Sequence, residues 1–131
     1  MDHLQIPATD DTLEVNFSPD TGLLVLKGES YPENPIDFFT PLIEWVEQYI
    51  EEINGPLTLN ATISYLNTSS SKCMLDLLEA LDNYYEADGE VTVNWYFEED
   101  DEDMEETGEE LCEDLELPYK IIPIEHEPDK R

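Results

Sequence analysis

One segment of this chain changes its hydrophobic period, and it limits the possible folds more than any other. Apolar and polar residues alternate over residues 57–66, and every second residue from Leu57 to Tyr65 is apolar. A period of two is typical of a β-strand with one apolar face. Directly downstream, apolar residues recur at helical spacing, which predicts a helix over about residues 69–85. A strand that passes directly into a helix is the repeating unit of an α/β fold.

Four consecutive hydroxyl residues stand at the junction between this strand and this helix: Thr68, Ser69, Ser70 and Ser71. Hydroxyl side chains are common helix caps, because the oxygen accepts a hydrogen bond from an unpaired backbone N–H. Alternatively, one of them is phosphorylated, since a phosphate at a helix N-terminus meets free N–H groups and the positive end of the helix dipole. Lys72, one of only five basic residues, lies one turn further along and is placed to pair with such a phosphate. In open α/β sheets this edge is where ligands and partners bind.

The remaining periodic segments predict a single α/β domain over residues 1–131, with polar termini at 1–12 and 125–131. The predicted order is ββαβαβαβ, which argues for a mixed sheet. One face of the strand at 57–66 is polar, so we expect the helices to lie mainly on the other face. The other predicted strands are residues 13–17, 23–28, 91–97 and 119–124, and the other predicted helices are residues 35–53 and about 103–114.

The first predicted helix begins at Pro35, because Asn34 is a good N-cap and proline is well suited to the first helical position. Pro41 is awkward inside this helix, since proline lacks an N–H and clashes with the preceding turn. Two alternatives follow. Either Pro41 kinks one long helix, or Thr40 caps a helix that begins at Pro41.

The charge of the chain limits its partners, because 34 acidic residues against 5 basic ones give a formal net charge of −29 at pH 7. Such a chain cannot follow a phosphate backbone, so we expect no binding to nucleic acid or to anionic membranes. No apolar run approaches the ~20 residues that span a bilayer, and the N-terminus does not resemble a signal peptide. We therefore expect a cytoplasmic location, with Cys73 and Cys112 as free thiols.

Residues 98–116 are especially acidic and carry a thin apolar stripe of Met104, Leu111 and Leu115. A Ca²⁺ site or an acidic docking arm is one interpretation, but the spacing does not match the loop of an EF-hand. We expect a solvated acidic helix and no metal. The sequence also lacks a glycine-rich phosphate loop, so no cofactor is expected.

A catalytic role finds little support in the sequence. The two histidines, His3 and His126, lie near the termini, so no Ser-His-Asp or Cys-His arrangement can be proposed. A small hydrolase with Thr68 or Ser69 as its nucleophile is an alternative, but an unactivated hydroxyl is a weak nucleophile and no base is apparent. We therefore expect that the chain is not an enzyme.

Residues 65–76, which read YLNTSSSKCMLD, resemble the signature of the SiaC family of bacterial regulatory phosphoproteins. The resemblance extends to four other segments, namely residues 30–34, 45–47, 95–96 and 110–119. It implies a fold like that of STAS-type anti-sigma-factor antagonists, and it implies phosphorylation at Thr68.

The resemblance also implies a regulatory circuit. A dedicated protein kinase modifies Thr68, and a PP2C-type phosphatase removes the phosphate. The unphosphorylated form then binds and activates an output enzyme such as a diguanylate cyclase. An anti-sigma-factor antagonist in a partner-switching circuit is the alternative. In either circuit the partner surface is expected around Thr68, at Asn67, Ser69, Ser70, Ser71 and Lys72.

The acidic composition predicts that added salt stabilises the fold. Ions screen the repulsion among the 34 acidic side chains, since the Debye length falls from about 10 Å at 0.1 M to about 3 Å at 1 M. Thermal melts at low and at molar NaCl should show a midpoint that rises with salt. An unchanged or lower midpoint would mean that charge repulsion does not limit the stability.

Overall fold

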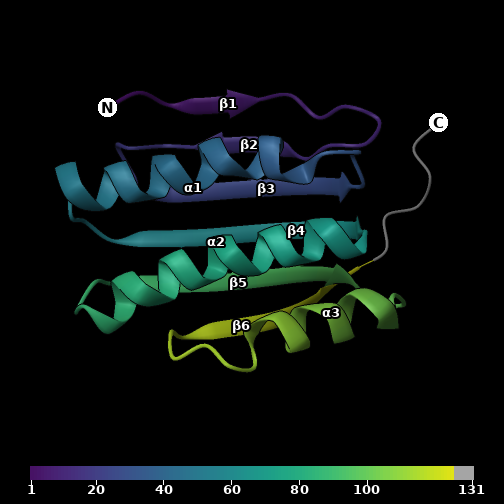
Figure 1. Ribbon diagram of the computed structural model, residues 1–131. Helices are drawn as coiled ribbons and strands as arrows, with labels where there is room; N and C mark the ends of the chain where they lie inside the picture. Colours follow the sequence, from purple (N-terminus) through teal and green to yellow (C-terminus); the bar gives the residue numbers. More distant parts are fainter. Residues whose placement is uncertain (126–131) are drawn as a thin grey trace.

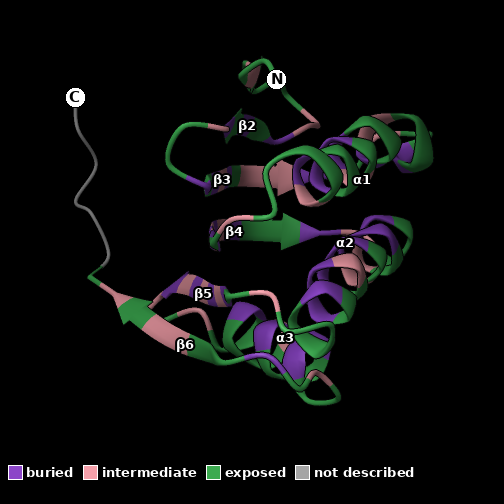
Figure 2. Cartoon of the chain, turned by 90° about the vertical axis from the view of Figure 1, so that its left-hand side faces the viewer, coloured by how far each residue is buried: buried purple, intermediate pink, exposed green. Residues whose placement is uncertain are grey.

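Three helices cover one face of a six-stranded mixed sheet in the computed structural model, which describes residues 1–125 (Figures 1 and 2). The strands lie side by side in sequence order. β2 is antiparallel to both of its neighbours, β1 and β3, whereas β3, β4, β5 and β6 run parallel. The strands are β1 (Leu4–Ile6), β2 (Glu14–Phe17), β3 (Leu23–Ser30), β4 (Leu57–Leu66), β5 (Val91–Glu98) and β6 (Tyr119–Ile124), and the helices are α1 (Pro35–Glu52), α2 (Thr68–Glu86) and α3 (Glu102–Cys112).

This arrangement confirms the predicted α/β class, the mixed sheet and the cover of helices on one face (Figure 2). The inward face of the sheet is apolar, and Phe17, Leu59 and Trp95 on three different strands are fully buried. The outward face is polar, and across it Asn94 Nδ2 donates a hydrogen bond of 2.9 Å to Asn60 Oδ1. The core therefore forms one layer between the sheet and the helices.

β1 (Leu4–Ile6) lies inside the segment that the sequence presents as a polar terminus, and the predicted order of elements lacks this strand. Leu4 pairs with Phe17 on β2, and Trp45 Nε1 donates a hydrogen bond of 2.9 Å to the backbone oxygen of Asp2. A strand of three residues is too short to show a period of two, so tertiary contacts decide its conformation. At the other end of the chain, all but the first residue of the predicted polar terminus lies outside the described residues.

α1 is one continuous helix, so the alternative in which a helix begins at Pro41 is wrong. Asn34 caps its first turn, as predicted. Thr40 caps nothing, because it lies inside the helix and its hydroxyl donates a hydrogen bond of 2.7 Å to the carbonyl oxygen of Ile36. The helix passes through Pro41 because its apolar side is buried against the sheet, which outweighs the lost backbone bond.

α3 is a helix at the surface, as its acidic composition predicted, although it ends at Cys112 rather than near residue 114. Trp95 on β5 holds it in place, since the indole Nε1 donates a hydrogen bond of 3.0 Å to the carbonyl oxygen of Met104. Gly108 lies against the same ring, where a Cβ atom would come within 2.4 Å of Cδ1. Only glycine allows the helix to approach the indole this closely.

Candidate functional site

Thr68 is the first residue of α2, and its side chain is exposed to solvent. β4 ends at Leu66, so only Asn67 separates the strand from the helix. This confirms the prediction that Thr68 lies at the N-terminus of a helix, within reach of solvent. The end of β3 lies alongside, since Ser30 pairs with Leu66. Thr68 therefore stands at the carboxyl edge of the parallel strands, where α/β proteins commonly bind partners.

The cap of α2 is not one of the four hydroxyl groups that the sequence suggested. Asn67 Oδ1 accepts a hydrogen bond of 2.8 Å from the backbone N–H of Ser70, and the backbone of Asn67 is extended, as an N-cap requires. Asparagine is among the best residues for this position, so it takes the role from the hydroxyls that follow it. The Thr68 hydroxyl is therefore not needed to begin the helix.

Ser70 is buried, and it ties the start of α2 to the end of β3. Its Oγ lies 2.8 Å from Ser30 Oγ, and neither side chain is exposed to solvent. The backbone N–H of Asn67 also donates a hydrogen bond of 3.0 Å to the carbonyl oxygen of Ser30. Ser70 thus lies beneath the surface formed by the other residues of the predicted site: Thr68, Ser69 and Lys72 are exposed, whereas Asn67 and Ser71 are half-buried.

A bulge beside this junction turns outward a tyrosine that the sequence placed on the apolar side of its strand. The register between β3 and β4 shifts between Gly28 and Glu29, so that Glu29 pairs with Tyr65 and Ser64 is skipped. The Ser64 hydroxyl donates a hydrogen bond of 3.2 Å to the carbonyl oxygen of Gly28. Beyond the bulge the alternation is reversed, so Tyr65 is 47% exposed whereas Leu66 is buried.

Tyr65 forms an exposed aromatic pair with Tyr31. The ring centroids are 6.1 Å apart with an interplanar angle of 65°, and Tyr31 is 44% exposed. Exposed tyrosines are typical of protein interfaces, where the ring buries apolar area and the hydroxyl stays polar. Sequence periodicity missed this pair, although Gly28 inside a predicted strand was the available signal for a bulge. Its φ of 117° is a conformation that other residues rarely adopt.

A groove of about 270 Å³ lies beside this surface, between the first turns of α1 and α2. Ile36 on α1 is 65% exposed and lines one side, and Lys72 on α2 lines the other. The groove brings Ser69 and Lys72 together with residues that the sequence did not connect to the hydroxyl run: Glu33, Asn34, Pro35, Ile36, Cys73 and Asp76.

Neither cysteine is an activated nucleophile, although Cys73 lines this groove. Burial raises the pKa of the Cys73 thiol, and Asp76 raises it further against the opposing effect of Lys72. Burial also raises the pKa of Cys112, to about 11. Both are free cysteines. Thiols with raised pKa values are protonated at neutral pH and react slowly.

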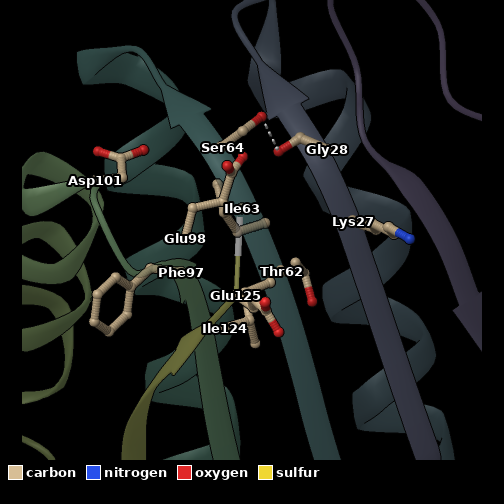
Figure 3. A pocket seen from close by; sticks show the side chains of 10 residues that line it. All are labelled: Lys27, Gly28, Thr62, Ile63, Ser64, Phe97, Glu98, Asp101, Ile124 and Glu125. Atoms are coloured by element: carbon tan, nitrogen blue, oxygen red, sulfur yellow. Dashed lines mark hydrogen bonds between the residues drawn. The ribbon is translucent and has the colours of Figure 1, made fainter. Parts of the chain in front are cut away.

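A second hollow, of about 500 Å³, is lined by residues in the carboxyl-terminal halves of β3, β4, β5 and β6 (Figure 3). Its lining carries the carboxylates of Glu98, Asp101 and Glu125, and the ammonium group of Lys27. Asp101 caps α3, because its Oδ1 accepts a hydrogen bond of 3.2 Å from the backbone N–H of Met104. No histidine or cysteine lines this hollow, and the hydroxyl of Ser64 in its lining donates its hydrogen bond to the carbonyl oxygen of Gly28.

The acidic segment itself is arranged as a solvated surface. Over residues 1–125, no three His, Cys, Asp or Glu side chains are grouped so that they could hold a metal ion. The expectation that residues 100–103 bind no specific metal stays a prediction. In the same part of the chain, the structure contains no helix of the length and apolarity that crossing a membrane requires.

Comparison with known proteins gives a family match over most of the chain. The family model described as SiaC family regulatory phosphoprotein matches residues 6–124. An uncharacterized protein of Pseudomonas aeruginosa (strain UCBPP-PA14) is 36% identical over 121 residues, which make up 92% of this chain and 96% of that protein.

Solved structures give the same result. The crystal structure of apo-SiaC from Pseudomonas aeruginosa is similar to this chain with a TM-score of 0.87 and 35% sequence identity, over 93% of this chain and 99% of that one. A chain in the crystal structure of the diguanylate cyclase SiaD in complex with its activator SiaC, from the same organism, is similar with a TM-score of 0.88 and 35% identity. That match covers 92% of this chain and 99% of the other.

The buried pair of Ser30 and Ser70 predicts a non-additive pattern of stability. Ser70→Ala leaves the Ser30 hydroxyl buried without its partner, so unfolding in urea should show a loss of about 1–3 kcal/mol. Ser30→Ala should cost a similar amount, for the same reason. The double variant should lose less than the sum of the two, because replacement of both hydroxyls leaves no orphan group.

Ser69→Ala is the matched control, since Ser69 is the exposed neighbour of Ser70. It should change the free energy of unfolding by no more than about 0.5 kcal/mol. Additive losses in the double variant would show that the two buried hydroxyls do not act as a pair.

Proposed function

The chain belongs to the SiaC family of regulatory phosphoproteins, and we propose that phosphorylation of Thr68 controls its binding to an output enzyme. The observation that carries this proposal is an exposed threonine at the first position of α2, with the helix cap supplied by Asn67 instead. In the matched complex, SiaC is the activator of the diguanylate cyclase SiaD. A diguanylate cyclase is therefore the output enzyme that we propose here, in preference to an anti-sigma factor.

A phosphate on Thr68 would add about −1.5 to −2 charges at the N-terminus of α2 without unfolding the helix. The positive end of the helix dipole favours a negative charge at this position. The capping bond from Asn67 goes to the backbone N–H of Ser70, so the phosphate need not displace it. Lys72 lies four residues further along the helix, on the same side, and supplies a cation that can pair with the phosphate.

The phosphate would act on the interface with the partner, and not on the folding of α2. A partner that covers Thr68 and the exposed pair of Tyr31 and Tyr65 must either remove water from the phosphate or pair it with a cation. An unpaired charge that becomes buried costs several kcal/mol, and about 1.4 kcal/mol already corresponds to a tenfold loss of affinity. The partner surface that we propose consists of Tyr31, Tyr65, Asn67, Thr68, Ser69, Ser71 and Lys72, with Ser70 supporting it from below.

The proposed circuit needs two further proteins. A protein kinase would transfer the phosphate to Thr68, and a PP2C-type phosphatase would remove it, as the family resemblance implies. The exposed position of Thr68 at the edge of the sheet leaves the hydroxyl open to both enzymes. We place this exchange in the cytoplasm. In this proposal the chain regulates an enzyme and has no catalytic role, so Thr68 serves as an acceptor of phosphate and not as a nucleophile of a hydrolase.

Substitutions at Thr68 should separate the hydroxyl from the charge. Thr68→Ala should retain the affinity for the diguanylate cyclase within about threefold, because Thr68 does not cap the helix. Thr68→Glu should weaken binding, although less than phosphorylation, since glutamate carries one charge and a different shape. Enzymatically phosphorylated protein should bind at least about tenfold more weakly than the unmodified protein. Titration calorimetry with the purified cyclase measures all three affinities.

Thr21→Glu is the matched control for the added charge. Thr21 is exposed and precedes β3, so it lies at the opposite edge of the sheet from Thr68, and this variant should bind like the wild type. Phosphorylated protein that binds the cyclase as tightly as the unmodified protein would overturn the proposal.

A further inference from the structure

One face of the sheet is left without a layer of helices. Within residues 1–125, α1, α2 and α3 all lie on the other face (Figure 2). The four parallel strands β3, β4, β5 and β6 point every second side chain away from the helices. These side chains belong to alternate residues over 23–27, 58–64, 92–98 and 120–124, and none of them is buried. We call this set of residues the open face.

The open face is almost free of the acids that cover the rest of the chain. It carries one acid, Glu98, and two lysines, Lys27 and Lys120. By contrast, α1, α2 and α3 carry five, four and six acids, with Lys72 as their only basic residue. The open face therefore has a formal charge of +1 in a chain of −29. Like charges keep acidic proteins apart in solution, and this face lacks that protection.

Apolar side chains lie on both flanks of the open face. On β3, Leu23 is 37% exposed and Val25 is half-buried. On β6, Ile122 and Ile124 are half-buried, and Tyr96 lies beside Ile122 on the neighbouring strand. The central strands supply uncharged polar groups. A surface of apolar and uncharged groups with few charges has the composition of the centre of a protein interface.

We propose that the open face is the contact between two copies of this chain, which pack sheet against sheet about a twofold axis. Such a contact uses the same surface on both copies, so it closes at the dimer. Packed sheets lie about 10 Å apart, and the acidic helices of the two copies then lie on opposite outer sides. The inference does not rest on the proposed function, because α2 and Thr68 lie on the other side of the sheet.

Charge argues for a second copy and against other occupants of the open face. A basic partner is drawn to the helices, which carry fifteen acids, and not to a face with a single acid. An anionic lipid surface or a nucleic acid is repelled by the net charge of the chain. In a face-to-face dimer, each copy meets the part of the other that repels it least.

The size of the open face predicts a weak dimer. Four strands about 4.8 Å apart, over about 20 Å of strand length, give a patch of about 400 Å² on each copy. Two such patches amount to about 800 Å², which is below the 1,200–2,000 Å² that stable interfaces bury. Glu14 and Glu125 lie at the rim of the open face, since Glu14 pairs with Lys27 and Glu125 follows β6. Their repulsion is screened by salt, so the dimer should be tighter at high ionic strength.

Sedimentation velocity over a range of protein concentrations measures the association. In 1 M NaCl the average mass should rise with concentration from the monomer to the dimer and stop there. The dissociation constant should be at least tenfold lower in 1 M than in 0.1 M NaCl, because the Debye length falls from about 10 Å to about 3 Å. A monomer at all concentrations in 1 M NaCl would overturn the proposal. Growth beyond the dimer would also overturn it, since a twofold contact cannot propagate.

Two pairs of substitutions locate the contact. Val25→Thr combined with Ile122→Thr removes apolar area from the open face and keeps the branched side chains that strands favour. Lys27→Gln combined with Lys120→Gln removes both cations at exposed positions, where the fold should tolerate the change. Each pair should weaken the dimer at least tenfold in 1 M NaCl. Unchanged association in the folded variants would show that the contact lies elsewhere.

Gln48→Glu combined with Asn83→Glu is the matched control for charge. Both residues are exposed on the helices, and the pair makes the net charge more negative by the same two units as the lysine pair. It should leave the dissociation constant in 1 M NaCl within about twofold. An equal loss in this control would show that the net charge of the chain, and not the open face, sets the association.

Cross-linking tests the geometry of the dimer directly. Thr62 lies near the middle of the open face, on β4 and opposite Tyr96 on β5. Thr62→Cys should therefore form covalent dimers with a bis-maleimide whose spacer is about 10 Å, the distance between packed sheets. Gln48→Cys, on the helix side, should not. The wild type is the background control, because Cys73 and Cys112 are buried. Equal cross-linking of the two variants would overturn the sheet-to-sheet arrangement.

Discussion

The hydrogen bonds of Ser30 join three elements at the edge of the sheet where Thr68 lies. Ser30 ends β3, its carbonyl oxygen accepts the backbone N–H of Asn67, and its hydroxyl meets that of Ser70 inside the protein. Asn67 in turn caps α2 through the same Ser70. The start of the helix is thus held by its neighbours from below, and Thr68 is presented on a rigid turn with its own hydroxyl unused. A phosphate on such a residue changes the charge of the surface rather than the path of the chain.

Much of this fold could be predicted from periodicity, and the exceptions have particular causes. The bounds of β4 and β6 agree with the prediction, because each strand begins directly after a proline, at Pro56 and at Pro118. β1 was missed because three residues carry no period, and Tyr65 was placed on the wrong side because a bulge reverses the alternation of β4. The position of Thr68 at the start of a helix could be predicted from the change of hydrophobic period. The family of the chain could be predicted from the resemblance of residues 65–76 to the family signature. The burial of Ser70 depends on its contact with Ser30 on β3, which is distant in the sequence. The capping bond from Asn67 to Ser70 is local, but the four hydroxyl residues that follow Asn67 offered competing caps.

The extreme acidity of the chain gives the surface around Thr68 its importance for the choice of partner. A net charge of −29 makes almost every exposed surface of this chain attractive to a basic partner, so charge alone gives little specificity. The surface near Thr68 adds exposed apolar area to this charge, with Tyr31 after β3, Tyr65 near the end of β4 and Ile36 in the first turn of α1. Lys72 adds one cation among many acids. A phosphate on Thr68 alters the part of the surface that discriminates between partners, and it leaves the core between the sheet and the helices unchanged.

Hydrogen exchange on the unmodified and the Thr68-phosphorylated protein tests most directly whether the switch acts on the surface without refolding. The amides in the first turns of α2 and at the end of β4 should exchange at the same rate in both forms, while the affinity of the same samples for the cyclase falls at least tenfold. Faster exchange over residues 68–74 in the phosphorylated form would contradict the account, because it would show that the phosphate melts the start of the helix.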